Sequence, residues 1–359
     1  MSVLLFIFIL GSLVLVHEFG HFITAKAAKI RVDEFGFGFP PKLFGFKKGE
    51  TEYTLNLLPF GGFVKIFGED PTDIPLDGEK KRSFIFKPKW IQMSVILAGV
   101  AFNFISAWLL LSITFMSGLE VPISYNAAAT DPRLMVTYVV ADSPASKAGL
   151  AAGDVILFLE NESGALQEVT PQKVSDFISS SEGEVTILYK RNGETQTVVV
   201  SPREGVIPQK KAIGISMDIV GTMRLPALQA LFEGGKTTLE LSQATFVGLT
   251  EFFGNIFKGQ GDFSQVSGPV GIASIVGDVS RLGLMHILSF MALLSINLGV
   301  INLLPFPALD GGRLLFLFIE TVTGSPLKMS FVRAAHGAGF VLLILLMLIV
   351  TFYDIVRLF

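Results

Sequence analysis

Hydrophobic residues are gathered into four long runs that are separated by more polar stretches. The runs cover about residues 2–25, 91–117, 284–306 and 338–357. A run of about 20 residues forms a helix about 30 Å long, which matches the hydrocarbon thickness of a bilayer. The pattern therefore predicts a polytopic α-helical membrane protein with four transmembrane helices.

Composition agrees with the membrane class. Hydrophobic residues make up 50% of the chain and charged residues 16%, and the mean hydropathy is +0.59. These values are typical of an integral membrane protein. The net charge of −3 argues against a nucleic-acid-binding surface. Because the chain has no cysteine, any metal must be held by His, Asp or Glu.

The charges of the connecting segments predict the orientation. Residues 22–90 hold 12 Lys and Arg, and residues 307–337 hold three against two acids, whereas residues 118–283 hold 12 against 18 acids. By the positive-inside rule, the first two connections are cytoplasmic and the long one is outside. Both chain termini are then expected outside.

The first hydrophobic run contains the pattern H-E-x-x-H at residues 17–21. His17, Glu18 and His21 are its only ionisable side chains between Ser2 and Ala25. An acid at the centre of a membrane helix costs about 2.5–3.5 kcal/mol, so these groups need partners. On a helix, His17 and His21 share a face and can bind one metal ion, while Glu18 lies beside them as a base for a water molecule.

Two simpler interpretations compete for this segment. One is a signal peptide, with Ala25-Lys26-Ala27 as its cleavage site. No Lys or Arg precedes the apolar run, however, and that site lies too far beyond it. The other is a chance match in an ordinary helix, since the pattern fixes only three positions.

A third ligand is predicted at the cytoplasmic end of the third run. Residues 302–311 read N-x-x-P-x-P-x-L-D-G, and Asp310 lies at the depth expected for His17 and His21. Two histidines, one carboxylate and an open position are typical of a catalytic zinc site. Pro305 and Pro307 prevent a regular helix and leave backbone groups free near the metal.

Alternatives to this third ligand remain open. Asp310 in a solvated helix cap is the simpler interpretation of the motif. His336 lies on the same predicted side of the membrane as Asp310 and is a rival ligand, whereas His286 lies near the opposite face. The ligand set suits zinc better than iron or cobalt, although the sequence does not select the metal.

Together these motifs resemble the site-2 protease family of intramembrane zinc metalloproteases, and in particular the bacterial regulator of sigma-E protease type. Further matches are residues 36–38 and 58–64, Gly99, Asn103-Phe104 and residues 267–272, with Val100 where the family usually has Pro. The resemblance implies a zinc metalloendopeptidase of the bacterial inner membrane that performs regulated intramembrane proteolysis. Its substrates would be single-span membrane proteins already cut outside, such as anti-sigma factors, or remnant signal peptides.

The resemblance also implies roles for individual residues. His17, His21 and Asp310 would hold Zn²⁺, and Glu18 would be the catalytic base. Asn302, together with Asn297, would bind the substrate backbone near the zinc, and Pro305 and Pro307 would also contact the substrate. Residues 31–66 would form a membrane-associated β-hairpin region whose edge strand holds the substrate extended, and Gly61 and Gly62 would allow close backbone approach.

The long outside connection carries a second resemblance. Residues 143–156 resemble the S-P-A-x-x-A-G-L-x-x-G-D-x-I hallmark of bacterial PDZ domains. Strand patterns at 134–140, 155–159, 185–189 and 195–200, a hairpin turn at Asn192-Gly193 and a helix at 172–179 predict a small β-sandwich. Residues 213–215 would border a groove for a peptide C-terminus. The implied role is a gate that admits trimmed substrates; the alternative is a groove that binds nothing.

The predicted organisation has four parts. These are an N-terminal membrane part (1–127), an extracytoplasmic PDZ domain (128–220), amphipathic membrane-surface helices (221–283) and a C-terminal membrane part (284–359). Within the third part, residues 226–257 are expected to break into two helices at Gly234-Gly235. Two other functions stay open, a non-catalytic PDZ-bearing membrane scaffold and a metal transporter. Glu18 argues against the scaffold, and the single depth of the polar residues argues against the transporter.

Overall fold

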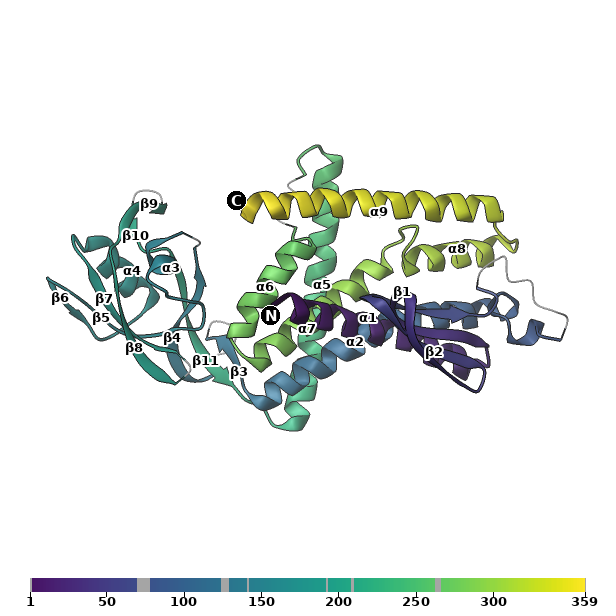
Figure 1. Cartoon of the computed structure of the whole chain (residues 1–359), viewed down its shortest axis with the longest axis horizontal. Helices are drawn as coiled ribbons and strands as arrows, with labels where there is room; N and C mark the ends of the chain where they lie inside the picture. The colour runs from purple at the N-terminus through teal and green to yellow at the C-terminus, as the bar shows by residue number, and fades with distance from the viewer. Residues whose placement is uncertain are drawn as a thin grey trace. The chain divides into compact units, whose positions relative to one another are not determined.

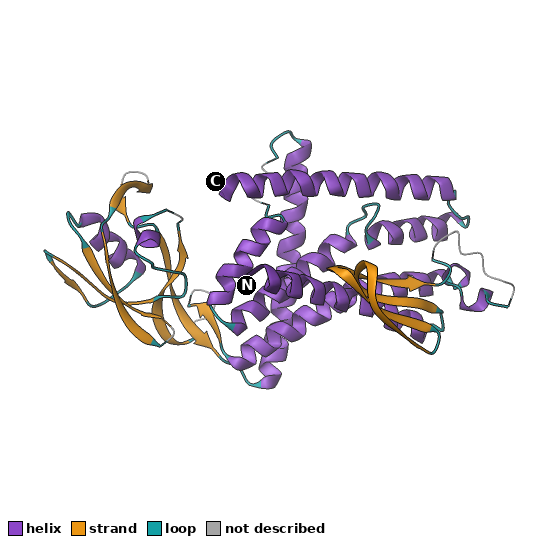
Figure 2. Cartoon of the chain, in the orientation of Figure 1, coloured by secondary structure: helices purple, strands orange, loops and turns teal. Residues whose placement is uncertain are grey.

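The fold is seen in a computed structural model that describes residues 2–69, 78–123, 129–140, 142–191, 193–207, 210–261 and 266–358. The chain forms two compact units. Unit 1 comprises Met1–Ser112, Leu231–Gly277 and Leu288–Phe359, and unit 2 comprises Ile113–Ala230 and Asp278–Ile287. Figure 1 shows the elements of both units, and Figure 2 shows that helices dominate the first and strands the second.

Among the residues that the structure describes, four helices are long and apolar enough to cross a membrane. They are α1 (Ser2–Ala27), α2 (Lys89–Ser117), α7 (Leu284–Leu303) and α9 (Met329–Leu358). The prediction of four apolar helices is therefore confirmed, with two shifted boundaries. Helix α7 ends before Pro305, which cannot donate a backbone hydrogen bond, and α9 starts at Met329 rather than at residue 338.

Strands β1 (Val32–Lys48) and β2 (Thr51–Ile66) form a bent two-stranded sheet in unit 1. Residues 34–37 of β1 pair with residues 62–65 of β2 and also with residues 52–55. The last part of β2 therefore lies along one outer edge of this sheet. Ile66 at its end packs into a buried cluster with Ala25 and Ile30, and with Val95 of α2.

Helix α5 (Ala227–Phe257) is continuous, so the predicted break at Gly234-Gly235 is wrong. The two glycines serve helix packing instead. A Cβ atom on Gly234 would lie 2.4 Å from the Ser112 hydroxyl, and one on Gly235 would lie 3.3 Å from the Trp108 indole nitrogen. The Trp108 indole N–H also donates to the Leu231 carbonyl at 2.7 Å.

Shorter helices also occur outside the sheet of unit 2. They are two 3-10 helices, η1 (Lys80–Arg82) and η2 (Phe84–Phe86), and the α-helices α6 (Pro269–Arg281) and α8 (Asp310–Thr323). The Asp354 carboxylate of α9 accepts backbone N–H bonds from Gly268 at 3.1 Å and Gly271 at 2.8 Å. It thereby caps the first turn of α6, which gives residues 267–272 a structural role.

Unit 2 is built on a sheet of strand order β3-β11-β4-β5-β7-β8, with β6 paired to β5 and a separate β9–β10 pair. The strands are β3 (Leu119–Pro122), β4 (Thr130–Val139), β5 (Val155–Asn161), β6 (Gly164–Leu166), β7 (Val185–Arg191), β8 (Glu194–Val200), β9 (Arg203–Ile207), β10 (Lys210–Ala212) and β11 (Ile215–Met223). Two helices accompany the sheet, α3 (Pro144–Lys147) and α4 (Pro171–Ser180).

The G-D motif of unit 2 is explained by an ion pair between a buried carboxylate, Asp154, and a partly exposed Arg191. The Asp154 carboxylate accepts two hydrogen bonds of 2.6 Å from Arg191 and one of 2.8 Å from the backbone N–H of Ala151. The Arg191 guanidinium also donates to the Gly149 carbonyl at 2.8 Å. These bonds connect the turn at residues 149–154 to β7. Asn192 of the predicted hairpin turn lies outside the described residues, but the flanking strands β7 and β8 are paired antiparallel from Arg191 and Glu194 onward.

Candidate metal centre

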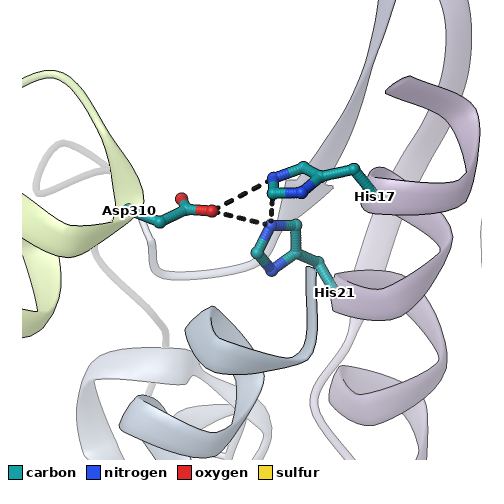
Figure 3. A group of neighbouring side chains, drawn as sticks. All are labelled: His17, His21 and Asp310. Atoms are coloured by element: carbon teal, nitrogen blue, oxygen red, sulfur yellow. Dashed lines mark hydrogen bonds and ion pairs between the residues drawn. The ribbon is translucent and has the colours of Figure 1, made fainter. Parts of the chain in front are cut away.

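Three predicted ligands converge in unit 1. One carboxylate oxygen of Asp310, Oδ2, lies 3.0 Å from Nε2 of His17 and 3.4 Å from Nε2 of His21. The two Nε2 atoms are 3.1 Å apart. Figure 3 shows the two imidazoles projecting from adjacent turns of α1 towards Asp310 at the start of α8. Sequence positions nearly three hundred residues apart thus meet at one point.

The three atoms fit a zinc ion. Zinc holds nitrogen and oxygen ligands at about 2.0–2.2 Å in a tetrahedral arrangement, which places neighbouring ligand atoms about 3.3 Å apart. The observed separations of 3.0, 3.1 and 3.4 Å are close to that value. Asp310 Oδ2 is also a buried atom without a hydrogen-bond partner. This donor set leaves a fourth position open, as in a catalytic site.

Glycines at the crossing of α1 and α2 allow the imidazoles to lie there. A Cβ atom on Gly99 would lie 2.3 Å from His21 Nε2 and 2.8 Å from His17 Cε1. A Cβ atom on Gly20 would lie 2.4 Å from the carbonyl oxygen of Ala98. Both positions therefore require glycine for close approach of the two helices. The match of Gly99 to the family pattern has this steric cause.

The remaining ring nitrogens are held by α2. Nδ1 of His21 lies 2.8 Å from the Val95 carbonyl, to which it donates. Nδ1 of His17 lies 3.0 Å from the side-chain amide of Asn103, which is fully buried. These contacts fix the ring orientations and leave both Nε2 atoms directed at Asp310, the arrangement found for metal-binding histidines.

Asp310 is positioned by a tight turn between α7 and α8. A Cβ atom on Gly311 would lie 2.2 Å from the Leu304 carbonyl oxygen, so the first turn of α8 packs directly on the end of α7. Ala308 has a positive φ of 80°, which is unusual for a residue other than glycine. Its backbone N–H donates to Nδ1 of His336 at 3.1 Å. Among the described residues, His336 therefore contacts the turn that leads to Asp310 and is not part of the metal-ligand cluster.

The environment keeps Asp310 ionised. Burial raises the pKa of this carboxyl group, but the adjacent imidazoles of His17 and His21 lower it by more. The resulting pKa lies well below the usual range for aspartate. The group is thus a carboxylate, as a metal ligand must be.

A cavity of about 560 Å³ opens beside the cluster. It is lined by Glu18 and the three cluster residues, by Phe63, Val64, Lys65 and Ile66 of β2, and by Glu69, Phe84, Val95, Ile96 and Arg313. Glu18 is therefore in the same cavity as the metal-ligand atoms and the edge of the β1–β2 sheet. This volume lies in the usual range for ligand sites, about 300–1,000 Å³.

Other residues predicted for substrate binding lie elsewhere in unit 1. Asn297 accepts a hydrogen bond of 2.9 Å from the Thr245 hydroxyl of α5. Asn302 is in the last turn of α7, and Pro305 and Pro307 are in the turn that follows it. None of these four is among the described residues that line the cavity. Gly62 is close to it, because a Cβ atom there would lie 3.5 Å from Cγ of Glu18, and the adjacent Gly61 has a positive φ of 102°.

Sequence reasoning missed two features of this site. One is the contact between Asn103 and His17; the match of Asn103 to the family pattern was a signal for it. The other is an ion pair between Arg313 and Glu69, both of which line the cavity. The nearby carboxylates of Glu69, Asp310 and Glu18 raise the pKa of the Arg313 guanidinium, so it stays charged.

An H-E-x-x-H helix joined by a carboxylate as the third metal ligand, at an open cavity, defines the metallopeptidase class, here built on helices long and apolar enough to cross a membrane. The family model described as peptidase family M50 matches residues 5–346. The chain therefore belongs to peptidase family M50, which confirms the predicted site-2 protease family.

Similar proteins cover the whole chain. The regulator of sigma-W protease RasP of Bacillus subtilis is 32% identical over 434 aligned residues, which cover 100% of this chain and 99% of the relative. The zinc metalloprotease RasP of Geobacillus kaustophilus is 31% identical over 434 residues, covering 100% and 98%. A Clostridium perfringens protein is 35% identical over 350 residues, covering 96% of each chain. The prediction of a zinc metalloprotease in an integral membrane protein is thereby confirmed.

Proposed function

We propose that this protein hydrolyses peptide bonds within or near the transmembrane segments of single-span membrane proteins that have already been cut outside the membrane. His17, His21 and Asp310 hold zinc, and Glu18 is the catalytic base. Anti-sigma factors and remnant signal peptides are the substrate classes. The observation that carries the proposal is that Glu18, the three ligand side chains and one edge of the β1–β2 sheet line a single cavity.

The chemistry assigned to each residue follows from this arrangement. A zinc ion held by His17, His21 and Asp310 would supply Lewis acidity, which makes a water molecule at the site more acidic. Glu18 accepts the proton of the attacking water and returns it to the leaving amine. The α2 contacts of His17 and His21 keep both rings oriented towards Asp310. The apolar lining by Phe63, Ile66 and Phe84 limits the access of bulk water to the reacting bond.

The end of β2 suits the binding of an extended substrate. Residues 63–66 line the cavity, and residues 62–65 pair with β1 on one side only in the described register. An added strand would pair with the other side and present its backbone beside Glu18. This matters because the carbonyl groups of a helical substrate are occupied by its own hydrogen bonds.

The surface of unit 1 supports a membrane location. Bulky apolar side chains of the β1–β2 sheet are exposed, among them Leu43 at 61% and Phe44 at 62%. Only 17% of the apolar span in α9 is buried within the protein. Such exposed apolar surface fits lipid contact. With the loop charges, it supports a bacterial inner-membrane protein with unit 2 and both termini outside and the metal centre near the cytoplasmic side.

Unit 2 is assigned as a PDZ-type gate. A small cavity of about 40 Å³ lies beside α4 and residues 210–215. Within the described residues, β3 pairs only with residues 220–223 of β11, so residues 215–218 have an edge that can accept a peptide strand. The proposed ligand is the trimmed outside end of a substrate, a peptide C-terminus in the PDZ manner.

Cleavage of single-span reporters in proteoliposomes tests the proteolytic function. The reporters carry outside portions of graded length, and wild type is compared with Glu18→Gln and with chelated protein. We expect cleavage by wild type alone, because Glu18→Gln retains the ligand set and its zinc but lacks the base. Zinc content measured on the same samples separates loss of base from loss of metal. A zinc-loaded Glu18→Gln protein that still cleaves would contradict the proposed role of Glu18.

A bulky residue in the groove of unit 2 tests the gate. Ser175 lines this groove, whereas Asp176 next to it is exposed and does not. Ser175→Trp is expected to change the ratio of cleavage rates for trimmed and untrimmed reporters, and Asp176→Trp is the matched control. Equal ratios in both variants and wild type would show that the groove does not select substrates.

A further inference from the structure

The ion pair between Arg313 and Glu69 joins the two parts of the active site. Glu69 comes shortly after Ile66, the last residue of β2, and Arg313 lies one helical turn after the ligand Asp310 on α8. Residues at i and i+3 of a helix are neighbours on one face. The pair therefore connects the substrate edge of the sheet to the helix that carries a metal ligand.

The backbone at the Glu69 end of this connection is fixed locally. The Glu69 backbone N–H donates to the Ile66 carbonyl at 3.1 Å, and the Phe67 N–H donates to the Arg31 carbonyl at 2.9 Å. Gly68 has a positive φ of 73°, and a Cβ atom there would lie 1.8 Å from the Ser83 hydroxyl. The backbone of Glu69 is thus held close to Ile66, the last residue of β2.

The end of β2 and helix α8 also make hydrophobic contacts, which are not directional. Leu314 and Leu317 of α8 pack against the buried cluster that contains Ile66. Apolar contacts hold two elements together, but they are non-directional. A charge-assisted hydrogen bond from a guanidinium has a defined direction and length. The ion pair can therefore set the position of β2, along the direction of the strand, relative to Asp310.

We propose that the Arg313–Glu69 ion pair sets the register of the substrate strand relative to the metal centre, and so selects which peptide bond is cut. This inference rests on the proposed binding of substrate along residues 62–66. Arg313 and Glu69 are positioning residues that act through β2 and α8. A strand advances about 3.3 Å per residue, so a displacement of that size presents the neighbouring peptide bond.

The test replaces either partner by a neutral residue of similar shape, Glu69→Gln or Arg313→Gln. Glu320→Gln is the matched control, because Glu320 pairs with Lys89 and lies on the same helix α8. The two pairs are similarly exposed, with side-chain values of 40% and 19% for Arg313 and Glu69 and of 39% and 16% for Lys89 and Glu320. The double variant Glu69→Arg/Arg313→Glu restores an ion pair with reversed polarity.

Mass spectrometry of the products of one reporter is the first readout, with kcat and KM measured in parallel. Glu69→Gln and Arg313→Gln are expected to cut at neighbouring bonds as well as at the wild-type bond, with kcat reduced on the order of ten- to a hundredfold. Glu320→Gln keeps the wild-type bond, and the double variant regains it. Unchanged cleavage positions and kcat in both single variants would overturn the inference, as would a double variant that still cuts at the neighbouring bonds.

A second readout does not depend on cleavage. The chain has no cysteine, so spin labels at Lys65→Cys in β2 and Phe318→Cys in α8 report one distance between the two elements. That distance distribution is expected to broaden with Glu69→Gln and to stay narrow with Glu320→Gln. If wild type cleaves no reporter while Glu69→Gln still broadens the distance distribution, the proposed substrates are refuted, but the ion pair is shown to hold β2 and α8 in place. If Glu69→Gln leaves the distance distribution unaltered, the ion pair does not position β2 relative to α8.

Discussion

Replacement of Asn103 should weaken zinc binding although this residue is not a ligand. The side-chain nitrogen Nδ2 of Asn103 lies 3.0 Å from Nδ1 of His17, and its oxygen Oδ1 is buried without a hydrogen-bond partner. A histidine that binds metal through Nε2 carries its proton on Nδ1 and needs an acceptor there. A flip of the amide, which exchanges its nitrogen and its oxygen, brings Oδ1 to that position. One flip thus satisfies both Asn103 Oδ1 and the His17 ring.

The magnitude follows from the loss of this acceptor. Asn103→Leu keeps a similar volume but leaves the Nδ1–H of His17 buried and unpaired. Loss of such a partner typically costs 10–100-fold in metal affinity, or about 1.4–2.7 kcal/mol. Asn103→Asp retains an acceptor and is expected to keep wild-type affinity or exceed it. Ser295→Ala is the control, because its hydroxyl donates to the Asn103 backbone carbonyl at 2.8 Å and does not touch the amide.

Competition between the purified protein and a chromophoric chelator measures the zinc affinity directly. The expected order is Asn103→Asp, then wild type and Ser295→Ala together, then Asn103→Leu. A thermal unfolding scan of the metal-free proteins checks that Asn103→Leu is folded. Equal zinc affinity for Asn103→Leu and wild type would refute the argument that Asn103 orients His17.

Three further predictions concern other contacts. Gly99→Ala places a methyl group 2.3 Å from His21 Nε2 and is expected to abolish zinc binding, whereas Gly248→Ala, with nothing within 4 Å, leaves it unchanged; zinc content of both purified variants decides this. Hydrogen bonds from Lys26 and Arg82 lower the pKa of Glu50 below its ordinary value of 4.5. The stability from these two ion pairs of Glu50, up to about 1 kcal/mol, is therefore fully present above pH 4.5 and is lost as the pH falls through the lowered pKa. The thermal unfolding curves of wild type and Glu50→Gln should converge at that low pH, and a difference that does not change with pH would contradict the prediction. Arg191→Ala leaves the buried Asp154 carboxylate uncompensated and should destabilise unit 2 by about 3 kcal/mol; hydrogen exchange of residues 134–200 should speed up in the full-length protein, and unaltered protection would show the pair to be dispensable.

The sequence was most informative where a single element determines the geometry. The shared face of His17 and His21 follows from helical periodicity alone, and the four apolar helices follow from run length. The convergence of Asp310 with them was predicted from loop charges and span order. Each of these inferences needs only one helix or the order of helices along the chain.

Contacts between elements could not be predicted in the same way. Gly234-Gly235 breaks many helices, but here the pair faces Ser112 and Trp108, which local sequence does not reveal. Asn297 is a polar side chain in an apolar helix, which made it a candidate for substrate binding. It instead accepts a hydrogen bond from Thr245 on a helix distant in sequence. The Arg313–Glu69 pair likewise depends on how α8 packs against the end of β2. Each of these contacts depends on how two elements pack together. The hydrophobic periodicity of one element carries no information about the surface of its partner.

The separation of the ligands along the chain has a consequence for biosynthesis. Glu18 and its two histidines leave the ribosome early, whereas Asp310 is made after nearly three hundred further residues. At about 5–20 residues per second, that interval is roughly 15–60 s. With the proposed roles, the nascent chain holds the base and two metal ligands during this interval but lacks Asp310. We therefore expect a nascent chain to be unable to cut its own emerging helices until the segment that carries Asp310 has been made.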